Sequence, residues 1–181
     1  MKGKKIIKLI VSLCILVSLI LVGTYTLYPK QYSQIVDEIS NQYELDPLFV
    51  YAVIWTESKF DTNAVSRSGA KGLMQIMDTT GKWGAEICEI KNYSSEKLFD
   101  PSINIQIGCW YISKLIKQYE GDIEMALAAY NAGSGNVAKW KSNTAYSSDG
   151  KTIHTIPFRE TDNYVKRVKF TYAIYKLLYK S

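Results

Sequence analysis

The sequence of 181 residues is poor in the residues that build disulfide scaffolds and metal centres. Its three cysteines, Cys14, Cys88 and Cys109, are too few for a disulfide framework, and their spacing fits no zinc motif. A single histidine, His154, argues against a histidine metal site and against a Ser-His-Asp triad. No alternating pattern predicts a sheet, and no internal repeat is visible. We therefore expect an all-α chain with no metal and no cofactor, in which His154 is a loop residue.

Acidic residues are missing from the start of the chain, where the first one is Asp37. Lys2, Lys4, Lys5 and Lys8 lie before it, and they account for most of the net charge of +5. Beyond residue 28 the balance is 18 basic to 17 acidic residues. A nucleic-acid partner would require a basic stripe on the folded part. The overall charge gives no support for one, and we expect no nucleic-acid binding.

A long apolar run follows the basic tail. Residues 6–27 are interrupted only by Lys8 near one end, and as a helix they would span about 33 Å, close to a hydrocarbon core of about 30 Å. Tyr25 and Tyr28 lie where an interfacial aromatic belt is expected. The lysines before the span predict a cytoplasmic N-terminus. Residues 1–28 are thus predicted to be a basic tail and a single-pass signal-anchor, with everything after Pro29 outside the cell.

A cleaved signal peptide is the alternative interpretation of this run. No A-x-A-like site follows it, since Val22-Gly23-Thr24 is a poor substitute. The residues before Cys14 do not form a lipobox. These absences favour an uncleaved anchor.

Residues 29–181 are predicted to form one helical domain, large enough for a single core. Asp46-Pro47 and Asp100-Pro101 are both typical of a helix start, with Asp as the N-cap and Pro in the first turn. Gly133 is expected to end a helix that Asp122 caps. Helices are expected over residues 33–43, 46–58, 100–119, 122–132 and 157–179. Residues 142–156 are polar and predict a loop or a small hairpin.

Glu57 is the first candidate for chemistry. It ends a segment, residues 49–56, that is apolar for two turns. Burial beside aromatic groups would raise the pKa of this carboxyl and keep it protonated near neutral pH, as a general acid requires. Periodicity alone leaves open a surface glutamate on the polar side of the last turn.

Four segments change that balance in favour of catalysis. They are Glu-Ser-Lys-Phe (57–60), Ser-Arg-Ser-Gly-Ala-Lys-Gly-Leu-Met-Gln-Ile-Met (66–77), Ala-Tyr-Asn-Ala-Gly (129–133) and Glu-Thr-Asp-Asn-Tyr-Val (160–165). In this order and spacing the set resembles the lytic transglycosylases of the soluble-transglycosylase (SLT, lysozyme-like) family, over about residues 33–175. Thr62 and Asp78 depart from the family, because prolines are common at both positions. Both lie in connecting backbone.

The resemblance implies a lysozyme-like α domain and a role for each matched residue. Glu57 matches the catalytic acid/base, and Ser66 matches a serine that orients it or contacts the N-acetyl group of the sugar. Gly69 and Gly72 would let the backbone approach a ligand closely. The remaining matches imply a lining of the glycan cleft, with an orienting role for the glutamate of the last motif: Gln75, Met77, Tyr130, Asn131, Glu160 and Tyr164.

The implied reaction is cleavage of the β-1,4 bond between N-acetylmuramic acid and N-acetylglucosamine in peptidoglycan strands. Glu57 would first protonate the bond and then act as base on the muramoyl 6-hydroxyl, which closes a 1,6-anhydro ring. Most glycosidases use two carboxylates, but the sequence identifies no nucleophile among its candidates: Asp61, Asp78, Asp100, Glu160 and Asp162. A hydrolytic muramidase of the same fold and a non-catalytic glycan-binding module stay open as alternatives.

Aromatic residues make 13% of the chain, a content that suits pyranose rings. Trp83, Trp140 and Tyr146 are candidates for the cleft. Cys88 and Cys109 both fall outside the predicted span, where two thiols can pair. A bridge between them and a buried free Cys109 stay open as alternatives.

Overall fold

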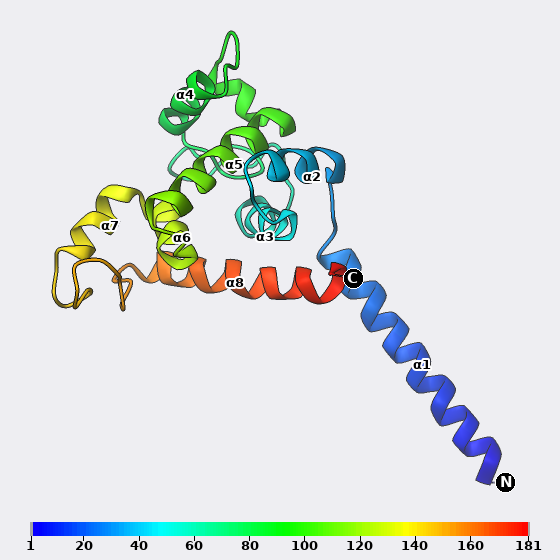
Figure 1. Ribbon diagram of the computed structural model, residues 1–181. Helices are drawn as coiled ribbons and strands as arrows, with labels where there is room; N and C mark the ends of the chain where they lie inside the picture. The colour runs from blue at the N-terminus through cyan, green and yellow to red at the C-terminus, as the bar shows by residue number, and fades with distance from the viewer. Residues whose placement is uncertain (1, 181) are drawn as a thin grey trace. The chain divides into compact units, whose positions relative to one another are not determined.

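The regular structure of the chain is helical throughout the part that the structure, a computed structural model, describes, namely residues 2–180 with side chains from residue 4 onward (Figure 1). Contacts divide the chain into two compact units, Met1–Gln31 and Tyr32–Ser181. The elements are α1 (Lys2–Leu27), α2 (Ser33–Gln42), α3 (Pro47–Ser58), α4 (Asp78–Ile87), the 3₁₀ helix η1 (Ser95–Phe99), α5 (Pro101–Gln118), α6 (Ile123–Ala132), α7 (Ser134–Lys141) and α8 (Arg159–Tyr179). This confirms the predicted all-α class.

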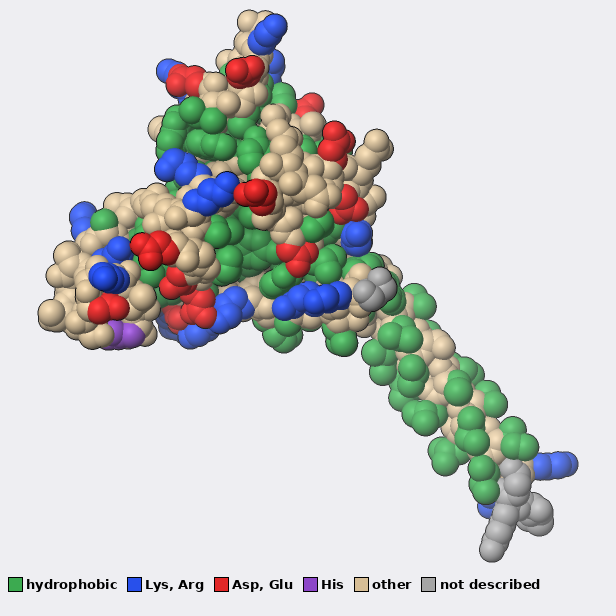
Figure 2. Space-filling model, viewed as in Figure 1, with side chains coloured by type: hydrophobic (Ala, Val, Ile, Leu, Met, Phe, Trp, Pro, Cys, Tyr) green, Lys and Arg blue, Asp and Glu red, His purple; other side chains and the backbone are tan. Residues whose placement is uncertain are grey.

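The first unit is the single helix α1. The stretch Lys4–Leu27 is long and apolar enough to cross a membrane. Hydrophobic side chains cover the visible face of α1 (Figure 2), and none of its large apolar residues from Ile6 to Leu27 is buried. A helix that is apolar on every side has no face to turn toward water, which is typical of a membrane span.

The second unit is built around α3. Six consecutive residues of α3, from Phe49 to Ile54, are buried, so the helix is enclosed on all sides. It packs against α8 and α2, while α5 packs against α2, α4 and α6. Burial of this apolar segment stabilises the fold by about 25 cal/mol per Å² of apolar surface removed from water.

The predicted helix starts are confirmed by their capping bonds. The carboxylate of Asp46 accepts from the Leu48 backbone N–H at 2.8 Å, and that of Asp100 accepts from Ile103 at 3.0 Å. Asp122 caps α6 in the same way. Each bond satisfies a backbone donor that the first helical turn leaves without a partner.

Three short helices and two isolated bridges were not predicted. The prediction lacked α4, η1 and α7, and it lacked the antiparallel bridges that join Lys71 to Val65 and to Ile76. Asp78, which replaces a common proline, is the first residue of α4 and places a negative charge in the first turn, where the helix dipole favours it. Residues 142–156 form an irregular loop after α7, so the hairpin alternative was wrong.

The cysteines are free. Cys109 is buried on α5, and burial raises the pKa of its thiol. The Cys88 sulfur lies 3.3 Å from the Tyr43 hydroxyl instead of bonding to Cys109. The structure therefore favours the buried-thiol alternative over the bridge.

Candidate functional site

Glu57 lies in the last turn of α3, where the enclosed helix emerges from the core. The residue is partly buried, and burial is the main reason that the pKa of its carboxyl rises from 4.5 to about 7. The nearby Tyr164 hydroxyl and the positive charge of Arg167 lower this pKa but are outweighed. The carboxyl is therefore neutral or ionised in comparable amounts near pH 7, which is the condition for exchanging protons in both directions.

Tyr164 projects from α8 toward this carboxyl. The residue is 2% exposed, and burial holds the pKa of its phenol well above 10, with the charge of Glu57 adding to the effect. The contact with Glu57 falls short of ordinary hydrogen-bond geometry, because the buried Tyr164 hydroxyl has no partner at bonding distance and angle among residues 2–180. A buried hydroxyl without a partner is costly. This one is available to a carboxylate or a ligand at the site.

No second carboxylate contributes to the environment of Glu57. Asp100 is occupied as the cap of α5, and Asp61 accepts from the Asn63 backbone N–H at 2.9 Å. Asp162 pairs with Lys166, and Asp78 accepts from the Tyr93 hydroxyl at 3.4 Å. Glu160 is exposed on α8. Within residues 2–180, the candidate second carboxylates are thus held elsewhere or exposed, and Glu57 is the carboxyl whose pKa is raised toward neutrality.

The segment Gly72–Ile76 is held against α3 and α6 by side chains. The Ser58 hydroxyl, next to Glu57, donates to the Leu73 carbonyl at 2.8 Å. The Tyr130 hydroxyl from α6 donates to the Met74 carbonyl at 2.8 Å. These two bonds tie the segment to the helices that carry Glu57 and Tyr130, so the three parts form one structural group.

Asn104, which the sequence analysis missed, organises the same segment from α5. It is fully buried there. Its amide oxygen accepts from the Met74 backbone N–H at 2.8 Å, and its amide nitrogen donates to the carbonyls of Lys71 at 2.9 Å and Leu98 at 2.7 Å. A polar residue directly before the apolar face of residues 105–116, and four positions before Gly108, was the available signal.

Gly72 packs closely against other parts of the protein. A Cβ at this position would lie 2.2 Å from the Leu98 carbonyl oxygen and 2.4 Å from the Asn104 amide nitrogen, and φ is +74°. Only glycine meets both conditions without strain. Gly69, with φ of +85°, has open space around it. Glycine at position 72 therefore lets the segment close onto Asn104, and its expected close approach to a ligand stays a prediction.

A cavity of about 240 Å³ lies beside this group, between the start of α4 and the end of α6. It brings together four of the predicted residues: Gln75, Met77, Tyr130 and Asn131. Its remaining lining residues are Ile76, Thr79, Thr80, Tyr111, Ala132 and Gly133. Burial, followed by the charge of Glu57, holds the pKa of Tyr130 well above 10. Tyr130 therefore connects the cavity to the carboxyl.

Three of the matched residues use their polar groups within the protein. The Gln75 amide nitrogen donates to the carbonyls of Ala64 at 3.1 Å and Gly72 at 2.9 Å. The Asn131 amide oxygen accepts from the Thr161 hydroxyl at 2.8 Å. The Ser66 hydroxyl accepts from the Ala70 backbone N–H at 3.0 Å within its own turn.

Glu160 lies apart from the cavity. It is exposed at the first turn of α8 and borders a shallow surface depression with Asn163, Arg167 and Phe170. Tyr164, one turn further along the helix, is buried. The spacing of four residues places the two side chains on neighbouring parts of the helix surface, but only Tyr164 faces the core.

Aromatic rings lead from the cavity to the surface. The ring of Tyr130 lies 5.5 Å from that of Tyr111, which lies 6.1 Å from Trp110, and Trp110 packs edge-on against Trp83 at 4.8 Å. Trp83 is 42% exposed and does not line the cavity, so its place in the cleft stays a prediction. Trp140 is instead buried against Phe158, so it is not a cleft residue.

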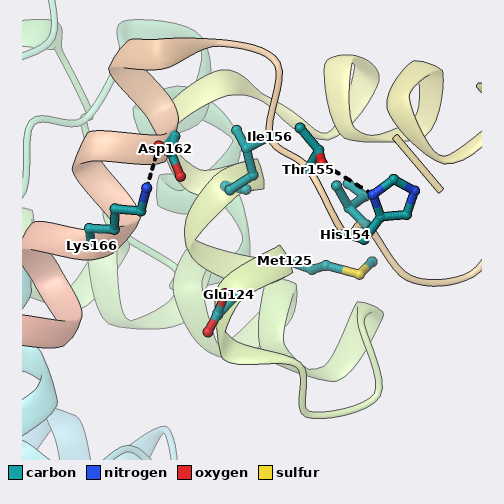
Figure 3. A pocket seen from close by; sticks show the side chains of 9 residues that line it. Glu124, Met125, His154, Thr155, Ile156, Asp162 and Lys166 are labelled. Atoms are coloured by element: carbon teal, nitrogen blue, oxygen red, sulfur yellow. Dashed lines mark hydrogen bonds and ion pairs between the residues drawn. The ribbon is translucent and has the colours of Figure 1, made fainter. Parts of the chain in front are cut away.

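A second cavity of about 290 Å³ lies between α6, α8 and the loop before α8 (Figure 3). None of the predicted site residues lines it. Lys166 pairs with Asp162 at 2.7 Å, and the exposed His154 contacts the Thr155 hydroxyl at 3.1 Å. Within residues 2–180, no three His, Cys, Asp or Glu side chains lie close enough to hold a metal ion.

The family model and the relatives that match this chain are all described as transglycosylases. The family model described as "Transglycosylase SLT domain" matches residues 34–153. The chain is 34% identical over 151 residues to the soluble lytic murein transglycosylase of Escherichia coli K12, covering 82% of this chain and 23% of that protein. It is 35% identical over 143 residues to membrane-bound lytic murein transglycosylase C of Edwardsiella ictaluri, covering 70% and 36%.

Solved structures give the same fold. The lytic transglycosylase Slt of Pseudomonas aeruginosa, solved as an inactive mutant, matches with a TM-score of 0.73 at 34% identity, covering 83% of this chain and 24% of that chain. The 70 kDa soluble lytic transglycosylase, solved in complex with bulgecin A, matches with a TM-score of 0.73 at 32% identity. The chain therefore spans about a quarter of the length of the soluble relatives that it matches.

Proposed function

Since the chain belongs to the transglycosylase SLT domain family, we propose that it is a peptidoglycan lytic transglycosylase with Glu57 as its single acid/base. The observation that carries this proposal is the Glu57 carboxyl at the end of the enclosed helix, with its pKa raised to about 7. It lies beside Tyr164 and Tyr130, and Tyr130 lines the adjoining cavity.

The reaction uses this carboxyl twice. In the first step protonated Glu57 donates its proton to the oxygen of the β-1,4 bond between N-acetylmuramic acid and N-acetylglucosamine, and the C1–O bond breaks. In the second step the Glu57 carboxylate removes the proton of the muramoyl 6-hydroxyl, whose oxygen bonds to C1 and closes the 1,6-anhydro ring. The proton balance closes without water, so a second carboxylate is unnecessary.

Of the surrounding residues, Tyr164 acts on the Glu57 carboxyl and the residues that line the cavity bind the glycan. Tyr164 stabilises the carboxylate form after the first proton transfer, because its hydroxyl lowers the pKa of Glu57. Met77 and Asn131 contact the sugar in the cavity, with Tyr130 and Gln75 behind them.

In this proposal Ser66 and Glu160 support the reaction without transferring its proton. The Ser66 hydroxyl accepts a backbone bond, and its own hydrogen can still donate to an acetamido oxygen. Glu160 orients the first turn of α8 and takes no part in proton transfer.

Product analysis tests this function against its closest alternative. We expect muropeptides released by the purified chain to carry 1,6-anhydromuramoyl ends, which are lighter than reducing ends by the mass of one water molecule. Mass spectrometry of the digest distinguishes the two products. Reducing ends would identify a hydrolytic muramidase, and an absence of any release with glycan binding retained would identify a binding module.

Tyr164→Phe is expected to lower the rate of release by about tenfold or more, because a bond to the charged carboxylate is lost. The hydroxyl lowers the pKa of Glu57, so its removal raises that pKa. The alkaline limb of the pH profile of kcat/KM, which reports ionisation of the acid in the free enzyme, should therefore move to higher pH. Tyr175→Phe, which removes the hydroxyl of another buried tyrosine of α8, is the control. An unmoved alkaline limb in Tyr164→Phe would contradict the assignment.

The cellular location is also proposed. We infer that α1 is an uncleaved single-pass anchor, with the lysines before it in the cytoplasm and residues 29–181 on the cell-wall side. The apolar length of Lys4–Leu27 and the membrane-bound relative support this inference. An anchor would restrict cleavage to glycan strands close to the membrane.

A further inference from the structure

The outer surface of α8 exposes large apolar side chains in the second unit. Phe170 is 66% exposed and Leu177 is 83% exposed. Their spacing of seven residues places them on one face of the helix, opposite the buried face that includes Tyr164, Val168 and Tyr175. Single exposed apolar residues are ordinary on protein surfaces. This pair differs because it lies on a helix that is rich in basic residues.

Positive charge is concentrated on the same helix. Residues 163–180 contain five basic residues and no acidic residue, whereas residues 29–162 contain 13 basic and 17 acidic residues. Lys166 and Lys169 pair with Asp162 and Glu124, which neutralises part of this charge. The remaining basic residues are Arg167, Lys180 and Lys176, whose ammonium lies 4.3 Å from the centre of the Tyr172 ring. Figure 2 shows hydrophobic side chains projecting from the α8 edge next to Lys and Arg side chains.

The sequence limits how far this helix can lie from a bilayer that holds α1. Only residues 28–32 connect the end of α1 to the start of α2. Five residues span at most about 17 Å when fully extended. The link therefore tethers the start of α2 near the membrane surface, whose anionic headgroups attract basic residues.

We propose that the outer face of α8, defined by Phe170, Leu177, Lys176 and Lys180, docks on the anionic lipid surface of the membrane. The proposal rests on the membrane anchoring proposed above. Basic residues that border exposed aromatic and aliphatic side chains are typical of helices that lie in the interfacial plane. A soluble or wall-bound polyanion would satisfy the lysines but would offer no apolar phase for Phe170 and Leu177.

Depth-dependent quenching in nanodiscs tests this docking with the full chain. Phe170→Trp adds an indole on α8, where the native chain has no tryptophan. Ile87→Trp, at an exposed apolar position of α4, is the matched control. We expect brominated lipids to quench the emission of the indole added on α8 about twofold more in nanodiscs containing phosphatidylglycerol than in neutral phosphatidylcholine nanodiscs, because each basic residue is attracted to the anionic surface.

Two further variants assign the effect to the helix face. Lys176→Glu with Lys180→Glu, made in the Phe170→Trp chain, should remove the difference between anionic and neutral lipids, and Leu177→Ser should weaken it. Equal quenching of the two added indoles would overturn the proposal. A dependence on lysine but not on Leu177 would overturn it in favour of polyanion binding. A chain that fails to enter neutral nanodiscs would overturn the anchor and, with it, the docking, whereas loss of catalysis in Glu57→Gln leaves this readout unaffected.

Discussion

Glu57→Gln is expected to lower the rate of muropeptide release by about 10³-fold or more, because general acid–base catalysis of this kind contributes about 10²- to 10⁴-fold per step and the same group serves both steps. Glutamine keeps the size of the side chain and removes the proton that it transfers. Release from purified peptidoglycan, followed by mass spectrometry, measures the loss. Glycan binding should persist. Undiminished release by this variant would refute the assignment of the acid.

The same substitution should stabilise the folded chain above neutral pH. The folded pKa of Glu57, about 7, lies above its ordinary value of 4.5, so the unfolded chain releases this proton first. As pH rises from about 4.5 to 7, the wild type therefore loses stability, by up to about 3 kcal/mol at 1.4 kcal/mol per pKa unit. Glutamine does not ionise and avoids this loss.

Urea unfolding at pH 4 and pH 8 measures that effect. The advantage of Glu57→Gln over the wild type should be larger at pH 8 than at pH 4, since the carboxyl is largely protonated in both the folded and the unfolded chain at the lower pH. Glu38→Gln, at an exposed position of α2, is the control and should show no such difference. An advantage that does not change with pH would mean that the Glu57 carboxyl is not desolvated.

Asn104→Ala is expected to destabilise the chain by about 2 to 6 kcal/mol, because it leaves two buried backbone groups without partners, each at a cost of about 1 to 3 kcal/mol, and a third group that is only partly buried. These groups are the Met74 N–H and the carbonyls of Lys71 and Leu98. Urea unfolding measures the loss. Activity should fall together with stability, since Met74 also anchors the Tyr130 hydroxyl.

Ser113→Ala is the matched control for this prediction. Ser113 is also buried on α5, and its hydroxyl donates a single bond, to the Tyr43 carbonyl at 3.0 Å. We expect a loss of about 1 kcal/mol and full activity per folded molecule. A comparable activity loss in both variants would show that α5 matters only for overall stability and that Asn104 has no specific effect on the segment Gly72–Ile76.

Local signals in the sequence predicted much of the fold. Asp46-Pro47 and Asp100-Pro101 identified two helix starts because capping depends on residues a few positions apart. The short helices α4 and α7 were not predicted because the residues at their starts, Asp78 and Gly133, are equally typical of turns. Short helices also depend on packing more than on intrinsic helix preference. The hairpin considered for residues 142–156 failed for a related reason, since hairpins need partners across the turn.

Side-chain partners were harder to foresee than helices. The sequence indicated Gln75 and Tyr130 as members of one site, but the Asn104 amide that holds their segment joins positions 30 residues apart. The choice between a disulfide and free thiols for Cys88 also depended on distance, and Tyr43 proved to be the neighbour. Glycine at position 72 was visible, but its contact with Leu98 was not.

The sequence by itself determined the apolar span, the capped helices and the four motifs that identify the family, because each is encoded by residues close together in the chain. The tertiary structure alone decided the burial that raises the pKa of Glu57, the approach of Tyr164 from α8, and the separation of the exposed Glu160 from the cavity. Desolvation and hydrogen-bond geometry depend on which atoms from distant segments surround a group. That arrangement exists only once α3, α6 and α8 have packed together.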